Sequence, residues 1–128
     1  MPLQVEISPG ELIDKLTILE IKLERMSDPA KLANVHHEHA VLKGVCDANF
    51  AATPRLLELK QQLKRINAAL WEIEDSIRDH ERGKDFGESF IALARSVYRT
   101  NDRRAATKRE INEYLNSDLF EEKSYAAY

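Results

Sequence analysis

The sequence predicts an all-α protein: a four-helix bundle-like domain dominated by one long antiparallel helical hairpin, with a short extended arm at the N-terminus. Two observations predict this class. The 128 residues include only four glycines and four prolines, and nearly all of these stand where a helix could begin or end. Between them, apolar residues recur every three or four positions, which is the period of one face of an α-helix.

A polar residue followed by proline marks the start of three predicted helices, because proline at the first helical position loses no hydrogen bond and its φ is already helical. The pairs are Ser8-Pro9, Asp28-Pro29 and Thr53-Pro54. Glu11, three residues after Ser8, completes a capping box. We therefore expect helices over residues 9–26, 29–49 and 54–82.

The fourth predicted helix covers residues 86–115. Asp85 and Glu88 form a second capping box, which marks the start of this helix. Gly83, just before the box, lacks a Cβ and therefore suits a left-handed end of the preceding helix. Only three residues separate this helix from the one over 54–82. A link that short forces an antiparallel hairpin of two helices, each about 45 Å long.

Apolar periodicity supports the two central helices of this map. The helix over 54–82 carries an unbroken coiled-coil-like seam, formed by Leu56, Leu59, Leu63, Ile66, Leu70, Ile73 and Ile77. The helix over 9–26 is different, since its leucines form one stripe while its isoleucines point to other sides. A helix that is apolar on several sides must be covered on several sides, so we expect either a central position or burial in a homodimer interface.

Composition narrows the class of protein. A chain of this length, 43% hydrophobic, predicts a single domain over residues 1–128 with its own core. Its single cysteine, Cys46, suits a reducing compartment. No segment approaches the roughly 18 apolar residues of a membrane span, and the first ten residues lack the pattern of a signal peptide. We therefore expect a cytoplasmic protein with no membrane partner.

Before the first helix, alternation of Leu3, Val5 and Ile7 indicates the extended arm.

Charge is distributed unevenly along the predicted hairpin. Acidic residues dominate positions 72–81 near the turn, whereas basic residues dominate positions 95–110 toward the open end. The antiparallel arrangement places this basic stretch level with Lys60, Lys64 and Arg65, so like charge accumulates at one end and attracts anions. The alternative is that carboxylates of the 9–26 helix, or a second subunit, neutralise the basic end.

Polar side chains also lie beside the apolar seams of the hairpin. They are Asn67, Trp71, Glu74 and Arg78 on one helix, and Arg95, Tyr98, Asn101, Asp102 and Lys108 on the other. One interpretation is a site for an anionic small molecule, in which arginine and lysine donate hydrogen bonds and Glu74 or Asp102 is the catalytic acid or base. The other is a fully bonded network that fixes the register of the helices.

The sequence predicts no metal site and no cofactor. His36, His37 and His39 lie close together, but neither HExxH nor CxxC spacing is present, so we expect His39 and Cys46 to pack against the fold while His37 and Glu38 face water. Glycine-rich phosphate loops are absent as well. The chain carries a net charge of −3, and its basic stretch has little aromatic content, so nucleic acid is not an expected partner.

Four blocks of the sequence resemble an uncharacterised bacterial family of small all-helical proteins, a domain of unknown function. The blocks are SPGELIDKLTILEIKLERM, LWEIEDSIR, FIALARSVYRTNDRRAATKREIN and EEKSY. The resemblance implies a bacterial intracellular helical domain and no particular activity. A weaker resemblance, in ELIDKLTIL and LKQQLKRINAALWEIED, is to the small helical chorismate mutases, and it implies a chemistry of arginines and a lysine around a dicarboxylate.

These observations predict a noncatalytic, self-associating interaction module. We expect a homodimer that associates through the helices over 9–26 and 54–82, and whose basic end binds an anionic small molecule or an acidic protein partner. The alternative is a small all-helical enzyme acting on an anionic metabolite. It would be either chorismate-mutase-like or a magnesium-dependent nucleotide pyrophosphohydrolase, the latter using Glu20, Glu24, Glu74 and Asp75.

Overall fold

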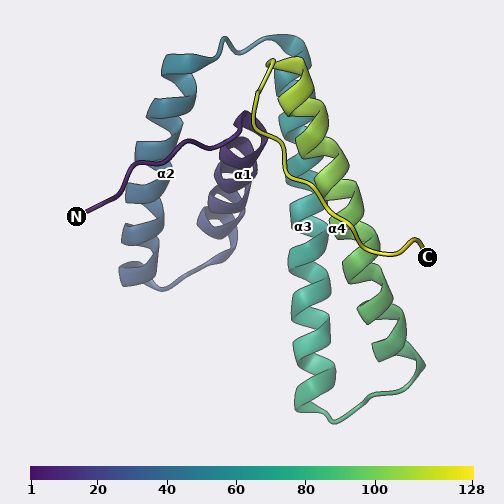
Figure 1. The fold of residues 1–128 in the computed structure, drawn as a ribbon. Coiled ribbons are helices and arrows are strands. Elements are labelled where there is room, and N and C mark those ends of the chain that lie inside the picture. Colours follow the sequence, from purple (N-terminus) through teal and green to yellow (C-terminus); the bar gives the residue numbers. More distant parts are fainter.

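The computed structural model describes residues 1–128 and contains four helices and no strands (Figure 1). The helices are α1 (Pro9–Arg25), α2 (Pro29–Asn49), α3 (Pro54–Arg82) and α4 (Glu88–Tyr114). The predicted all-α class and the antiparallel hairpin, formed by α3 and α4, are confirmed. None of the four helices is long and apolar enough to cross a membrane.

The three predicted helix starts are confirmed by their caps. The side chains of Ser8, Asp28 and Thr53 each accept a hydrogen bond from a backbone N–H in the first turn of the helix that follows. Each cap satisfies one of the N–H groups that a helix start leaves without an intrahelical partner. These short-range contacts explain why the starts were readable from the sequence.

The predicted start of the last helix was wrong by two residues. Helix α4 begins at Glu88, with Gly87 as its N-cap and no side-chain cap, because the Asp85 carboxylate instead accepts from the Gly87 N–H at 3.2 Å. The expected left-handed glycine at the preceding helix end was also wrong. Gly83 has a right-handed φ of −83°, and Lys84 takes the positive φ of 54°.

Helix α1 occupies the centre of the molecule. It packs against α2, α3 and α4, whereas α2 packs against α1 alone, as Figure 1 shows. The main apolar cluster joins Ile13 of α1 to Leu59 and Leu63 of α3 and Ile111 of α4, each at most 1% exposed. Of the two positions expected for this many-sided apolar helix, the central one is therefore found.

The hairpin extends well beyond α1. Helix α1 has 17 residues and α3 has 29, and Arg25 at the end of α1 pairs with Glu72 of α3. From Glu72 to its last residue, α3 therefore continues for about 15 Å at 1.5 Å per residue. We call residues 73–96 the hairpin tip. No residue between Asn67 and Thr100 is buried, so the core ends where α1 ends.

The C-terminal segment, residues 117–128, has no helical structure and runs back along α4 (Figure 1). We call it the strap. Glu121 lies 3.0 Å from the Lys108 ammonium, and the Tyr128 hydroxyl donates to Asp102 at 2.6 Å. At the other end of the chain, residues 1–7 form an exposed arm without secondary structure.

Candidate functional site

The most buried charged group of the molecule is Asp14 of α1, which is 1% exposed. Arg104 of α4 binds it with two nitrogens: Nε donates to Oδ1 at 2.9 Å and Nη2 to Oδ2 at 2.5 Å. The Asn67 side-chain amide of α3 donates to the same carboxylate and to the Thr17 hydroxyl, both at 2.9 Å. One carboxylate thus joins three helices.

The environment of Asp14 keeps its carboxylate ionised. Burial raises the pKa of Asp14, but hydrogen bonds from Arg104 and Asn67, together with the positive charges of Arg104 and Lys108, lower that pKa by more. The pKa therefore lies below its ordinary value. A carboxylate that is ionised and already fully bonded has no proton to give and no free oxygen to accept one, so Asp14 is a structural anchor rather than a catalytic acid.

A second polar contact lies one turn away, where α1 begins. The ammonium of Lys108 is bound by Glu11 of α1 at 2.7 Å and by Glu121 of the strap at 3.0 Å. Burial lowers the pKa of Lys108, but these two carboxylates raise it by more, so the lysine remains protonated. The Gly10 backbone N–H donates to the Asn112 side chain at 2.7 Å, which fixes the start of α1 against α4.

The basic end of the hairpin is partly neutralised within the chain. Carboxylates of α1 pair with Lys60 and Lys64 of α3 through Glu20 and Glu24, in addition to the pairs made by Asp14 and Glu11. Of the two alternatives for this end, neutralisation by the first helix therefore accounts for four of the nine cations. The strap adds carboxylates that the sequence pattern did not indicate.

Four of the predicted site residues are brought together in one place. Asn67, Trp71 and Glu74 of α3 and Asn101 of α4 line an open cleft of about 300 Å³, beside the last turns of α1. We call it the inner cleft. Arg104 also lines it. Its side chain is 29% exposed, and its Nη1 has no protein hydrogen-bond partner. The inner cleft therefore combines an aromatic ring, two amides, a carboxylate and a guanidinium.

The other predicted site residues lie elsewhere. Arg78 is exposed and pairs with Glu74 at 2.8 Å, and Arg95 is exposed with no carboxylate within 4.0 Å. Tyr98 and Asp102 lie under the strap, where they line a separate hollow of about 410 Å³ with Tyr128. Lys108 is occupied by its two carboxylates. The predicted set is therefore divided among several locations on α3 and α4.

The histidines of α2 do not gather around a metal site. His36, His37 and Glu38 are exposed, while His39 and Cys46 are half-buried, as expected from their places on the helix. Cys46 packs against the main apolar cluster, and burial raises the pKa of its thiol. No group of three or more His, Cys, Asp or Glu side chains is arranged to hold a metal ion.

Sequence patterns missed the residues that hold the site together. In the sequence, Arg104 is one of several cations of the basic stretch, and its position in the helical repeat does not distinguish it from Arg103. The distinction follows from the rotation of α4 about its axis, which turns Arg104 toward Asp14 and leaves Arg103 beside a different groove between α3 and α4. The role of the strap was equally hidden, because Glu121 and Tyr128 lie in a segment with no periodicity.

Comparison with known proteins yields one match. A family model described as "Family of unknown function (DUF6165)" matches residues 3–128. No curated protein and no solved structure matches the chain.

Proposed function

The chain belongs to the family of unknown function DUF6165, and we propose that it is a noncatalytic helical interaction module that self-associates through its hairpin tip. One observation carries this proposal. The apolar seam of the α3–α4 hairpin continues past the end of α1, where no other part of the chain covers it.

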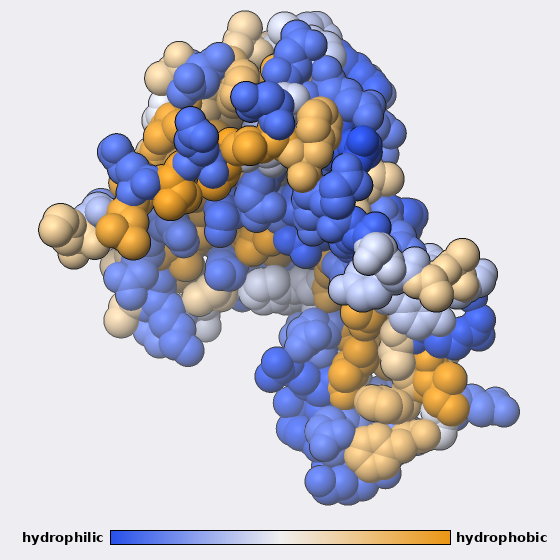
Figure 2. All heavy atoms as spheres, in the orientation of Figure 1, coloured by the Kyte–Doolittle hydropathy of each residue, from blue (hydrophilic) through white to orange (hydrophobic).

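The uncovered seam is formed by residues of both helices. Ile73 and Ile77 of α3 are only half-buried, although they continue the seam whose earlier members, Leu59 and Leu63, are fully buried. Their counterparts on α4 are Phe90 and Leu93, which are also half-buried. Phe86 and Ile91 are 49% and 55% exposed. Figure 2 shows apolar side chains gathered over this end of the molecule.

Such a surface is typical of an interaction site, since a contiguous exposed apolar patch is unusual on a monomer. A second copy of the chain is the partner that fits it best. Two hairpin tips have equal length and the same apolar seam, so a two-fold axis would pack them into a four-helix arrangement with each seam covered.

Charges at the tip favour the same arrangement. Asp75 and Glu81 of α3 and Arg95 of α4 have no ion-pair partner within their own chain. Because Asp75 and Glu81 lie on one helix of the tip and Arg95 on the other, two copies related by a two-fold axis can bring these opposite charges together. A tip-to-tip dimer would therefore cover apolar surface and pair charges at once.

Sedimentation velocity tests the proposal. We expect the wild-type protein to sediment as a dimer at micromolar concentration, and Ile91→Glu to weaken the dimer at least about tenfold, or about 1.4 kcal/mol. Ile91 is already 55% exposed, so the substitution leaves the monomer folded, which circular dichroism checks. The matched control is Leu57→Glu, at an apolar position that is 48% exposed at the opposite end of the hairpin.

Two results would overturn self-association through the tip. One is a wild-type monomer at micromolar concentration. The other is a dimer that Leu57→Glu weakens as much as Ile91→Glu does, because this would place the interface away from the tip.

The inner cleft supports a second candidate, a small enzyme acting on an anionic metabolite. The free Arg104 Nη1 could hold an anionic group, Trp71 could pack against the rest of the molecule, and Glu74 could transfer a proton. Thermal-shift measurements with citrate, a prephenate-like dicarboxylate and magnesium nucleotides test this candidate. A ligand at 100 times its dissociation constant stabilises a protein by about 2.7 kcal/mol. Absence of any shift would leave the interaction module as the one supported function.

A further inference from the structure

The strap lies along one face of α4 without becoming part of the core. Every strap residue after Ser117 is exposed, although the segment runs back along the helix (Figure 1). Beyond Ser117 the strap makes no backbone hydrogen bond to the helices. A segment held in this way can open locally while the helices stay folded. The residues of α4 that the strap contacts, which we call the strap face, are Tyr98, Arg99, Asp102, Lys108 and Arg109.

One end of the strap face binds carboxylates. The Lys108 ammonium lies 3.0 Å from Glu121, and the Arg109 guanidinium lies 3.2 Å from Glu122. Arg109 also lies over the Phe120 ring, 5.1 Å from its centroid. Two neighbouring cations can therefore bind two consecutive acidic residues of an extended chain through charge-assisted hydrogen bonds.

The other end of the strap face binds a tyrosine. The Tyr128 hydroxyl donates to Asp102 at 2.6 Å, and the Tyr128 ring meets the Tyr98 ring edge to face at 5.0 Å. The Arg99 guanidinium lies 5.9 Å from the centroid of the same ring. Because the Asp102 carboxylate accepts a hydroxyl proton and repels another carboxylate, this end selects tyrosine over an acidic residue.

The strap fits the strap face incompletely. A hollow of about 410 Å³ remains beside Tyr98, and Ala126 and Ala127 of the strap are among the residues that line it. Arg99 forms no ion pair with any carboxylate of the chain. A segment with larger apolar side chains in place of the two alanines would contact the face over more area than the strap does.

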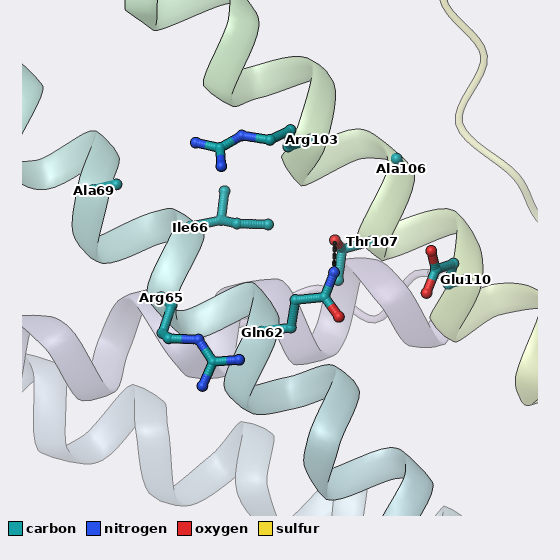
Figure 3. Close-up of a pocket in the computed structure, with 8 residues that line it drawn as sticks. All are labelled: Gln62, Arg65, Ile66, Ala69, Arg103, Ala106, Thr107 and Glu110. Atoms are coloured by element: carbon teal, nitrogen blue, oxygen red, sulfur yellow. Dashed lines mark hydrogen bonds between the residues drawn. The ribbon is translucent and has the colours of Figure 1, made fainter.

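The strap face is one side of α4 and does not include every cation of that helix. Arg103 is exposed and lies beside the groove between α3 and α4. Figure 3 shows its side chain extending toward Ile66 of α3. Arg103 therefore offers a control on the same helix for a change of charge outside the strap face.

We propose that the strap face is a docking site for an extended segment of a partner protein, and that the strap is the internal competitor of this segment. The partner segment has two consecutive acidic residues followed by a tyrosine, spaced as Glu122 and Tyr128 are, with larger apolar residues just before the tyrosine. The strap shows the binding mode, and its incomplete fit allows the partner to displace it. The strap face lies outside the hairpin tip and is independent of self-association, so either proposal can fail while the other stands.

Fluorescence anisotropy with the full-length protein tests the site. The probe is a labelled synthetic peptide of residues 117–128. In the wild type the attached strap competes with the peptide at a high effective concentration. The variant Glu121→Gln/Tyr128→Phe removes strap contacts and leaves α4 unchanged, so it should bind the peptide at least about tenfold more tightly than the wild type. Circular dichroism and sedimentation should show its fold and oligomeric state unchanged.

Two further comparisons use this loosened variant as the parent protein. Adding Arg109→Gln should weaken peptide binding about two- to fivefold, the scale of one exposed ion pair, whereas the matched control Arg103→Gln should bind like the parent. A second peptide, with Ala126→Leu/Ala127→Leu, should bind more tightly than the first, because its side chains fill the hollow beside Tyr98.

The docking site is overturned if the loosened variant does not bind the peptide, if it binds no more tightly than the wild type, or if Arg103→Gln loses as much affinity as Arg109→Gln. Equal affinity of the two peptides would overturn the larger apolar residues assigned to the partner. A loosened variant with fewer subunits than the wild type would show that straps are exchanged between copies, which would make a second copy the occupant and overturn the partner protein.

Discussion

At Gly10 the backbones of α1 and α4 approach so closely that no side chain fits between them. A Cβ added there would lie 2.5 Å from the Lys108 carbonyl oxygen and 2.9 Å from the Asn112 side-chain oxygen. The same approach allows the Gly10 N–H to reach Asn112. Glycine is therefore needed here for space, since its φ is not in the left-handed region.

Gly10→Ala should lower the free energy of unfolding by about 1–3 kcal/mol, because the new methyl group must push α1 away from α4. Urea denaturation measures the change. Gly44→Ala is the matched control: it lies on exposed α2 and has nothing within 4 Å of the added Cβ, so it should stabilise by about 0.8–1 kcal/mol through helix propensity alone. Equal effects from both substitutions would contradict the close approach.

Asp14 is the residue on which three helices depend. Asp14→Asn leaves the Arg104 guanidinium without its partner charge in a largely buried position, which should cost about 3 kcal/mol by urea denaturation. The control is Asp47→Asn, which breaks the exposed pair between Lys43 and Asp47 and should cost less than about 1 kcal/mol.

The contribution of Asp14 to the free energy of unfolding should also be lost at acidic pH. The folded state lowers the pKa of Asp14 from an unfolded value near 3.8. Its contribution is therefore fully present above that unfolded value and is lost as the pH falls through the lower, folded value. The difference in unfolding free energy between wild type and Asp14→Asn should be constant near neutral pH and should shrink below about pH 4. A constant difference down to pH 2 would argue against an ionised Asp14.

At the scale of elements, the strap beyond Ser117 is attached to α4 by side chains rather than by backbone hydrogen bonds or core residues. Besides the contacts of Glu121 and Tyr128, Glu122 pairs with Arg109 at 3.2 Å, and the Tyr98 and Tyr128 rings meet edge to face at 5.0 Å. No residue of the strap is buried. It is therefore an attachment to a fold that the helices complete by themselves.

Removing residues 117–128 should leave the helical content per molecule unchanged and lower the free energy of unfolding by about 1 kcal/mol, the scale of a few exposed or partly exposed ion pairs. Circular dichroism with thermal denaturation measures both quantities. Glu121→Gln should account for more of the loss than Glu122→Gln, because the Lys108 side chain is 10% exposed and the Arg109 side chain 49%. Loss of helical content on truncation would show that the strap belongs to the core.

At the scale of the whole molecule, the half of the hairpin that α1 covers and the hairpin tip are stabilised differently. Helix α1 covers the hairpin from its open end as far as Glu72, and every buried residue of α3 and α4 lies in that half. In the proposed dimer, the second copy replaces α1 as the cover for the tip. Stability then depends on protein concentration, because unfolding separates the two copies.

The thermal midpoint should therefore rise with concentration. Each tenfold increase adds about 1.4 kcal/mol per dimer, which corresponds to about 2–4 °C for an unfolding unit of this size. Differential scanning calorimetry over two decades of concentration measures the trend, with Ile91→Glu as the control whose midpoint should rise less over the same range. A wild-type midpoint that does not change with concentration would contradict the dimer.

The sequence by itself determined the helices and the hairpin, because the causes of both are local. Caps such as Ser8 and Thr53 bond within one turn of their own helix, and a three-residue link leaves two long helices no arrangement other than antiparallel. The prediction failed at residues 83–88, where the left-handed position fell on Lys84 and the Asp85 carboxylate accepted a hydrogen bond from Gly87 instead of capping the helix.

Only the tertiary structure decided which polar residues act together. Asn67 and Asn101 line the same cleft as predicted, but Asp102 and Lys108 turn toward the strap, and Arg104 is separated from Arg103 by the rotation of α4. Helical spacing gives the direction in which a side chain leaves the axis of its helix. Which residue that side chain contacts depends on how the helix is rotated relative to the neighbouring helices. The packing of α1 sets that rotation, so it decided which cations are neutralised and which remain free.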